Sequence, residues 1–183
     1  MKNVYVVLSR SNTILARMIR LFTQKRYSHT SFALDKRCEP FYSFGRRYPR
    51  LMFPTGFITE GMASGFFKVH PKVPAAVYEI PVTGEQYALI EERLKPFIAD
   101  PLHYKYSIVN IFLQARGIPL QRENKYVCSA FVAYLLEGIV DFGKDISLVY
   151  PHEFQEKGFE LIYEGLTKDY AAFYESLHET EEE

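Results

Sequence analysis

The stretch "KYVCSAFVAYLL", from Lys125 to Leu136, decides how the rest of the chain is interpreted. Its apolar residues recur with the spacing of a helix, and Cys128 stands where that pattern begins. The first turn of a helix carries free backbone N–H groups and the positive end of the helix dipole, and both stabilise a thiolate. Cys128 can therefore be a core residue, half of a disulfide, a metal ligand or a nucleophile.

The composition is that of one domain with a substantial core. The chain has 183 residues, of which 48% are hydrophobic, and its formal net charge is zero. A neutral chain lacks the positive surface that broad nucleic-acid binding requires, so we expect no nucleic-acid partner. No apolar run approaches the ~18 residues of a membrane span. The N-terminal "MKNVYVVLSRSN" is interpreted as a strand and not as a signal peptide, which favours a cytoplasmic location.

The cysteine and histidine pattern argues against a metal site and against a disulfide. Cys38 and Cys128 are the only cysteines, and without an export signal we expect both to be reduced and unpaired. The sequence has no CxxC, HxxxH or clustered Cys/His pattern of the kind that binds structural zinc. We therefore expect no metal and no other cofactor.

The order of the expected elements is typical of an α+β fold, because runs of strands are separated from runs of helices. Strands are expected at residues 3–9, 28–35, 40–47, 75–82 and 159–165, and the second and third of them form a hairpin. Residues 48–74 are expected to be a long loop that contains short strands at most. Helices are expected from Ser11 or Asn12 to Phe22, from a Thr83/Gln86 capping box to about Ile98, from Ser107 to Gly117, from Cys128 to about Gly138, and briefly between Pro151 and Gly158. The expected domain spans 1–165, followed by an acidic and partly helical tail at 166–183.

A cysteine nucleophile needs a base that accepts its proton, and the base is usually a histidine. Of the five histidines in the chain, His29 alone opens a strand, which fixes the direction of its side chain. The other four lie in loop-like, turn or tail settings: His70, His103, His152 and His178. Judged from the residues alone, Cys128 as a buried core residue and an unremarkable His29 remain an alternative to a catalytic pair.

The motifs "YSHTSFAL" and, about a hundred residues later, "YVCSAFVAYLL" resemble the circularly permuted branch of the NlpC-type, papain-like cysteine hydrolases. This branch includes the YiiX/YebB-like proteins and, more distantly, the lecithin:retinol acyltransferase-like enzymes. In it the histidine strand precedes the cysteine helix, as it does here, and the likeness extends from about residue 3 to residue 165. The resemblance implies a papain-like antiparallel sheet or partial barrel packed against helices, with Cys128 as nucleophile at a helix N-terminus and His29 as general base.

The resemblance also implies a third polar residue, on the strand after the histidine, that orients the imidazole. Side chains alternate across a strand, so Ser43 shares a face with His29 when the sum of the paired residue numbers in the hairpin is even. Ser43 is then the candidate, although the family more often uses an acidic or amide side chain. The alternative is that a backbone carbonyl or a water orients His29.

The remaining candidate residues surround the expected cleft. The backbone N–H of Cys128 is one expected oxyanion donor, and Tyr104 and Tyr106 are candidates for the second or for substrate binding. Tyr126, two residues before the cysteine, is a candidate for lining the cleft. A cluster of arginines could attract an anionic substrate or simply be a solvated loop: Arg46, Arg47 and Arg50.

The leading functional hypothesis is a thiol hydrolase that cleaves a peptide or isopeptide-like amide, or an ester, through a Cys128 thioester. We expect the pKa of Cys128 to lie below the usual ~8.5, because a helix start and an imidazolium both favour the thiolate. One alternative is a lipid or acyl transferase of the same superfamily, and another is a non-catalytic binding domain that keeps the fold. The expected partner is thus a small-molecule, peptide or lipid-derived acyl substrate.

Overall fold

The fold was analysed in a computed structural model that describes residues 1–10, 24–48, 50–51 and 53–179. The expected first helix, between Ser11 and Phe22, lies outside these residues. No helix in the described part of the chain is both long enough and apolar enough to cross a membrane.

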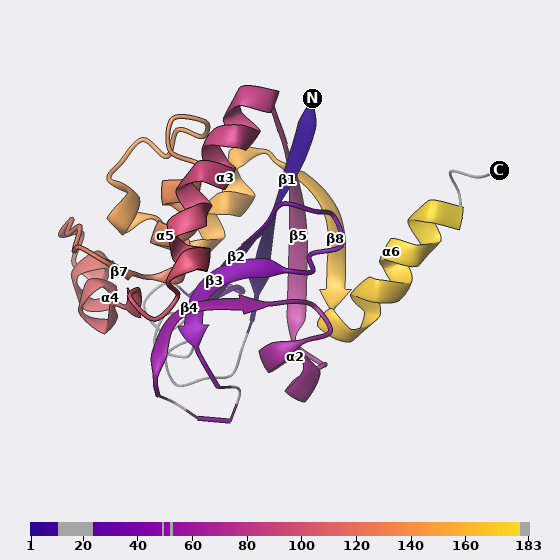
Figure 1. Ribbon diagram of the computed structural model, residues 1–183, viewed down its shortest axis with the longest axis horizontal. Coiled ribbons are helices and arrows are strands. Elements are labelled where there is room, and N and C mark those ends of the chain that lie inside the picture. The colour runs from indigo at the N-terminus through magenta and orange to yellow at the C-terminus, as the bar shows by residue number, and fades with distance from the viewer. Residues whose placement is uncertain (11–23, 49, 52, 180–183) are drawn as a thin grey trace.

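A six-stranded sheet in which all neighbouring strands are antiparallel forms the centre of the molecule (Figure 1). The strand order is β4-β3-β2-β1-β5-β8, so the first strand of the chain lies in the interior of the sheet. The strands are β1 (Lys2–Ser9), β2 (His29–Ala33), β3 (Phe41–Arg46), β4 (Thr55–Glu60), β5 (Pro74–Val82) and β8 (Glu160–Leu166). A small parallel pair, β6 (Lys105–Tyr106) and β7 (Lys125–Tyr126), lies outside this sheet.

The helices cover the two faces of the sheet unequally. They are α2 (Gly65–Val69), α3 (Gly84–Ala99), α4 (Ile108–Ala115), α5 (Cys128–Leu135) and α6 (Tyr170–Glu179), with 3-10 helices at Ile146–Leu148, Pro151–Lys157 and Thr167–Asp169. Helices α3 and α5 lie over one face, whereas α2 and α6 lie on the other side (Figure 1). The expected α+β class is therefore confirmed at the level of an antiparallel sheet packed against helices.

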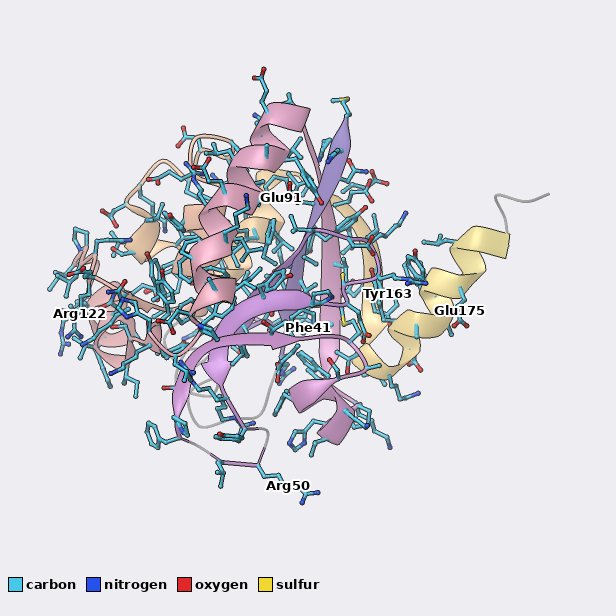
Figure 2. All side chains as sticks on the ribbon, viewed as in Figure 1. Phe41, Arg50, Glu91, Arg122, Tyr163 and Glu175 are labelled. Carbon is cyan, nitrogen blue, oxygen red and sulfur yellow. The ribbon has the colours of Figure 1, made fainter. Side chains whose placement is uncertain are left out.

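Strand alternation divides the core into two clusters, one on each face. On the α5 face, Phe32 of β2 and Phe44 of β3 pack with residues of α3 and α5, in what we call the α5-face core. On the opposite face, Ala33 and Phe41 pack with Phe67 of α2, in what we call the α2-face core. Figure 2 shows Phe41 on its strand in the middle of the molecule. Because the two cores are separated by the sheet, a residue's strand parity decides which core it joins.

Local sequence signals explain why several elements begin and end where they do. Helix α3 starts at a capping box in which Thr83 accepts from the Gln86 N–H and Gln86 accepts from the Thr83 N–H. Ser107 likewise caps α4 through the N–H of Asn110. Gly158, with a φ of 72°, ends the 3-10 helix that Pro151 opens.

The long loop expected at 48–74 contains more structure than its composition indicates. Its residues 55–60 form β4, which pairs with β3 along its whole length, and residues 65–69 form the single-turn helix α2. Phe57 and Phe67 from this segment are buried in the two cores. One turn of helix and one edge strand are too short to produce a sustained periodic pattern, which is why the sequence did not predict α2.

Candidate functional site

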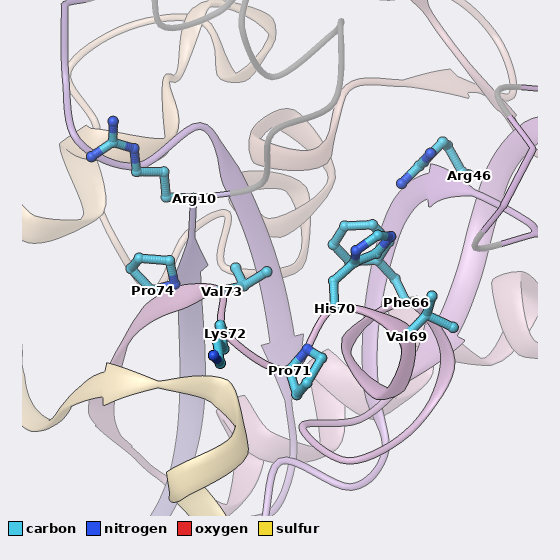
Figure 3. Close-up of a pocket in the computed structure, with 9 residues that line it drawn as sticks. All are labelled: Arg10, Arg46, Phe66, Val69, His70, Pro71, Lys72, Val73 and Pro74. Atoms are coloured by element: carbon cyan, nitrogen blue, oxygen red, sulfur yellow. The ribbon is translucent and has the colours of Figure 1, made fainter.

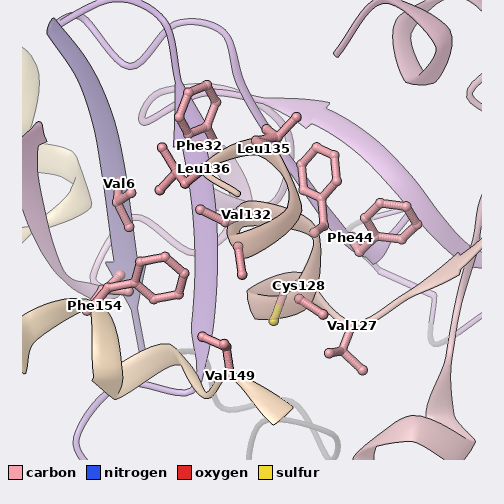
Figure 4. Packing of buried hydrophobic residues seen from close by; sticks show 14 of the residues in the cluster. Val6, Phe32, Phe44, Val127, Cys128, Val132, Leu135, Leu136, Val149 and Phe154 are labelled. Atoms are coloured by element: carbon pink, nitrogen blue, oxygen red, sulfur yellow. The ribbon is translucent and has the colours of Figure 1, made fainter. Parts of the chain in front are cut away.

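Cys128 is the first residue of α5, and its side chain is only 1% exposed. The residue before it, Val127, has extended backbone and no side chain that could cap the helix. The N–H groups of the first turn therefore keep the freedom to face another acceptor. Figure 4 shows the sulfur at the start of the helix, in the part of the core that also holds Val127 and Val149.

The sulfur of Cys128 is surrounded by hydrogen-bond donors. The backbone N–H groups of Thr30, Ser129 and Cys128 itself, together with the Tyr106 hydroxyl, all lower the pKa of the thiol. Burial acts in the opposite direction and outweighs them, so the pKa of Cys128 is raised from its ordinary value. The expectation of a lowered pKa for Cys128 is therefore wrong, because desolvation destabilises the thiolate more than the four hydrogen-bond donors stabilise it.

His29 is fixed at the start of β2 by its two neighbouring strands. Its Cα pairs with Ser9 of β1, and the Phe32–Tyr42 pair of the β2–β3 hairpin gives the even sum that places Ser43 on the same face. The Ser43 Oγ lies 3.2 Å from the His29 Nε2. A Cβ at Gly45 would lie 3.7 Å from the His29 Cε1, an ordinary van der Waals contact, so Gly45 of β3 lies next to the ring.

The second hydrogen bond of Ser43 indicates which ring nitrogen carries the proton. The Ser43 hydroxyl donates to the Thr30 carbonyl at 2.6 Å, which uses its only hydrogen. Its oxygen can then only accept from His29, so Nε2 is the protonated nitrogen and Nδ1 keeps a free lone pair. Burial lowers the pKa of His29 to about 4, so the ring is neutral near neutral pH.

His29 and Cys128 lie at the same end of β2 without a direct bond. The sulfur is within hydrogen-bonding reach of the N–H of Thr30, the residue that follows His29. Cys128 packs in the α5-face core, whereas Ser43, which holds the ring, is on the face that carries Phe41. Among the residues that the structure describes, no hydrogen bond joins the sulfur to the imidazole.

Two buried hydroxyls beside this pair have no partner in the described part of the chain. They are the Oγ of Ser9, whose residue is the β1 partner of His29, and the Oγ1 of Thr30. Buried hydroxyls are normally hydrogen-bonded, so an unpartnered one is often explained by a ligand or water. Both residues are at most 1% exposed, so any such partner has to reach into the interior around His29.

The three candidate tyrosines do not share one environment. Tyr106 is buried with its hydroxyl hydrogen-bonded to Cys128. Tyr104 and Tyr126 instead contact the ring of Phe97, with ring centroids 4.1 Å and 5.4 Å from it. Tyr106 is therefore the one of the three that contacts the thiol, and the other two pack against the edge of the α5-face core.

The three candidate arginines also separate in space. The guanidinium of Arg47 donates to the carbonyls of Pro101 and Tyr104, at 2.7 and 2.9 Å. Arg50 projects outward from the loop between β3 and β4 (Figure 2). Arg46 points toward α2, and its guanidinium lies 4.9 Å from the ring centre of Phe66. They therefore do not form one anion-binding cluster.

Cys38 lies in the turn between β2 and β3, at the opposite end of this hairpin from His29. It is a free thiol, as Cys128 is, and it packs in the α2-face core. Its sulfur donates to the Tyr170 hydroxyl at 3.5 Å, and burial raises the pKa of Cys38 to about 12. The sheet lies between the two cysteines, because each belongs to the core of a different face.

The backbone N–H of Thr30 is the contribution that the sequence did not reveal. A main-chain donor leaves no residue-type signal, so the role of this N–H could not be predicted from the sequence.

Within the described ranges no group of three or more His, Cys, Asp or Glu side chains could hold a metal ion. The sequence matches no family model, and no curated protein matches it either.

Proposed function

We propose that this protein is a thiol hydrolase of the circularly permuted, papain-like type, with Cys128 as nucleophile, His29 as general base and Ser43 as the residue that positions His29. The observation that carries the proposal is the convergence at the start of β2. The sulfur of Cys128, at the start of α5, accepts a hydrogen bond from the Thr30 N–H. The residue before Thr30 is His29, whose imidazole is held by its hydrogen bond to Ser43. The chain order, histidine strand before cysteine helix, supports the permuted arrangement.

The neutral state of both groups defines the first chemical step. The Cys128 thiol is protonated and the His29 imidazole is neutral, because burial disfavours the charged form of each group. When a substrate carbonyl arrives, His29 Nδ1 takes the proton from the thiol and the sulfur attacks the carbonyl carbon. In the structure His29 lies with Ser43 on the Phe41 face and Cys128 lies on the other face, so this step requires the start of β2 to rearrange until the imidazole reaches the thiol.

The later steps use the same groups in reverse. The tetrahedral oxyanion is stabilised by the backbone N–H groups of Cys128 and Ser129 in the first turn of α5. The imidazolium returns its proton to the leaving amine or alcohol, and a thioester with Cys128 remains. Water, deprotonated by His29, attacks the thioester, which releases a carboxylic acid and restores the thiol.

The burial of Cys128 favours one alternative, a binding domain that keeps the fold but performs no chemistry. A sulfur that is 1% exposed must be uncovered before any carbonyl can reach it. A lipid or acyl transferase would share the first step and differ only in the acceptor of the thioester. These alternatives are separated by testing first whether a thioester forms.

The test is acylation by p-nitrophenyl acetate, followed by intact-mass and peptide mass spectrometry. We expect an acetyl group on Cys128 in the wild type and in Cys38→Ser, and none in Cys128→Ser. His29→Ala should slow acylation by about 100-fold or more, the usual contribution of a general base. Acylation that is equal at the two cysteines, or that does not change in His29→Ala, would favour the binding domain.

The acceptor is identified by adding alcohols or amines to the acylated protein. Release of free acetate alone supports the hydrolase. Transfer to the added acceptor in preference to water supports the transferase.

A further inference from the structure

A basic cavity of about 550 Å³ opens on the α2 side of the sheet, at the end where β1 finishes. Its lining comes from the end of β1, the end of β3, helix α2 and the segment that leads into β5: Arg10, Arg46, Phe66, Val69, His70, Pro71, Lys72, Val73 and Pro74 (Figure 3). The size is within the range of pockets that hold a small organic ligand.

Positive charge is in excess around this cavity. Arg10, Arg46 and Lys72 come from three different segments, and within the described part of the chain none of them forms an ion pair. Among the described residues, the acid that acts on Arg46 is Glu60, whose Oε1 accepts the N–H of Phe66 at 2.8 Å. One carboxylate does not balance three permanent cations, so the cavity remains positive.

The arrangement of these groups favours an anion with an apolar body. The Arg46 guanidinium lies over the ring of Phe66, and the His70 ring packs against the same ring in a tilted arrangement, with centroids 4.5 Å apart. Figure 3 shows the Arg46 guanidinium directed toward this pair. The uncharged remainder of the lining is apolar: Val69, Pro71, Val73 and Pro74. Guanidinium groups bind phosphate and carboxylate in a planar, bidentate manner, while the apolar walls accommodate a hydrocarbon or ring.

The cavity is also adjacent to the residues that surround His29. Arg10 directly follows Ser9, the β1 partner of His29, and Arg46 directly follows Gly45, which faces the His29 ring. Two of the three cations are therefore one residue away from positions that contact or pair with the proposed base.

We infer that this cavity binds a ligand that joins an anionic group, phosphate or carboxylate, to an apolar body. The anion contacts Arg46, while Arg10 and Lys72 add positive potential from the other side of the cavity, and the apolar part lies against Phe66 and Val69. The further statement that this ligand is the substrate, bound by its acidic end, rests on the proposed hydrolase function.

The binding test uses Cys128→Ser, so that its result does not depend on catalysis. Isothermal titration calorimetry is performed with phenyl phosphate, phenylacetate and benzyl alcohol, which share a ring and differ in charge. We expect one or both anions to bind at least about 10-fold more tightly than the alcohol, as charge-assisted hydrogen bonds predict. The stronger of the two anions identifies the headgroup. Equal binding of the alcohol, or no binding of either anion, would overturn the inference.

Substitutions locate the binding to the cavity. In the Cys128→Ser background, Arg46→Ala should weaken binding of the preferred anion about 10-fold, and Arg10→Ala should weaken it by a smaller factor. Lys95→Ala, an exposed cation on α3 across the sheet, is the matched control and should leave the affinity unchanged. Arg10 is exposed, so its variant keeps the test valid even if Arg46→Ala destabilises the fold. Equal loss in Lys95→Ala would overturn the assignment to this cavity.

The link to catalysis is tested separately. In the protein with Cys128 intact, the preferred anion should inhibit acylation by p-nitrophenyl acetate competitively, and Arg10→Ala should relieve this inhibition. If the anion binds but does not inhibit acylation, the cavity is an anion-binding site but not a substrate site. If no acylation occurs at all, the proposed function fails while the calorimetric result still decides the binding site.

Discussion

The Oγ of Ser43 lies 3.2 Å from the Nε2 of His29, diagonally across the β2–β3 pair, and the same hydroxyl donates to the Thr30 carbonyl. This bond fixes the orientation and the tautomer of the ring, so that Nδ1 is the nitrogen left to accept a proton. We therefore expect Ser43→Ala to lower the rate of Cys128 acylation about 10-fold, less than His29→Ala does, because the base remains but its orientation is lost.

The role of Ser43 in positioning is distinguished from a purely structural role by the ring itself. The NMR spectrum of the His29 imidazole should show Nε2–H in the wild type and a mixture of tautomers in Ser43→Ala. Ser31→Ala, a buried serine on the same face of β2, is the control that should leave the tautomer unchanged. An unchanged tautomer in Ser43→Ala would show that another group orients the ring.

Stability should depend on the charge state of His29. Burial lowers the pKa of this residue from 6.5 to about 4, so between these values the unfolded chain binds a proton that the folded chain does not. The stability that His29 contributes is therefore complete above pH 6.5 and is lost as the pH falls toward 4, by about 3.5 kcal/mol at most given ~1.4 kcal/mol per pKa unit. Urea unfolding at neutral and acidic pH measures this loss.

The comparison with substituted proteins isolates the His29 contribution from that of other groups. His29→Gln should reduce the difference in free energy of unfolding between the two pH values. His103→Gln, at an exposed position, should keep the whole difference. A His29→Gln protein with the pH dependence of the wild type would contradict the lowered pKa.

The two thiols should differ in reactivity although both are buried. Cys128 has three backbone N–H groups and the Tyr106 hydroxyl to support a thiolate, whereas the Tyr170 hydroxyl beside Cys38 accepts from the thiol and donates its hydrogen to the Lys36 carbonyl. Iodoacetamide should therefore label Cys128 faster than Cys38 near neutral pH, with a rate that rises as the pH increases, because the thiolate is the reacting form. Peptide mass spectrometry over a pH series gives both rates, and faster labelling of Cys38 would refute the difference.

Tyr106 should tune the thiol of Cys128. Its hydroxyl hydrogen-bonds the sulfur and lowers the pKa of Cys128, so Tyr106→Phe should raise that pKa and slow alkylation at a fixed pH by about 3- to 10-fold, the effect of one hydrogen bond. Tyr104→Phe is the matched control, because its ring contacts Phe97 and its hydroxyl does not bond the sulfur. Equal slowing in both variants would mean that the hydroxyl of Tyr106 has no specific role.

Several elements could be predicted because their signals are local. The Thr83/Gln86 capping box marked the start of α3, and the β2–β3 hairpin was recognised from two short β-patterned runs around Cys38. Strand alternation predicted that Ser43 shares a face with His29 if the paired residue numbers of the hairpin have an even sum, and the Phe32–Tyr42 pair has such a sum. None of this required knowledge of distant parts of the chain.

The features that sequence reasoning missed depend on burial and on distant segments. The pKa of Cys128 was expected to fall, but its depth in the core could not be read from a helix pattern. The cations Arg10, Arg46 and Lys72 belong to three segments that carry no shared motif, so only the folded sheet brings them around one cavity. The helix α2 was missed because one turn is shorter than the period that reveals a helix.

The place of β8 at the edge of the sheet has a consequence for how the chain folds. Strand β5 pairs on one side with β1, but its other edge is completed only by β8, through pairs such as Pro74 with Leu166. The chain between β5 and β8 is much longer than the turn between β2 and β3. Pairing β8 with β5 is therefore slow compared with forming the β2–β3 hairpin, because the entropy of closing the long loop is lost before the pairing stabilises the sheet. During synthesis the outer edge of β5 therefore stays unpaired until residue 166 has left the ribosome, and an unpaired sheet edge is a template for pairing with another chain.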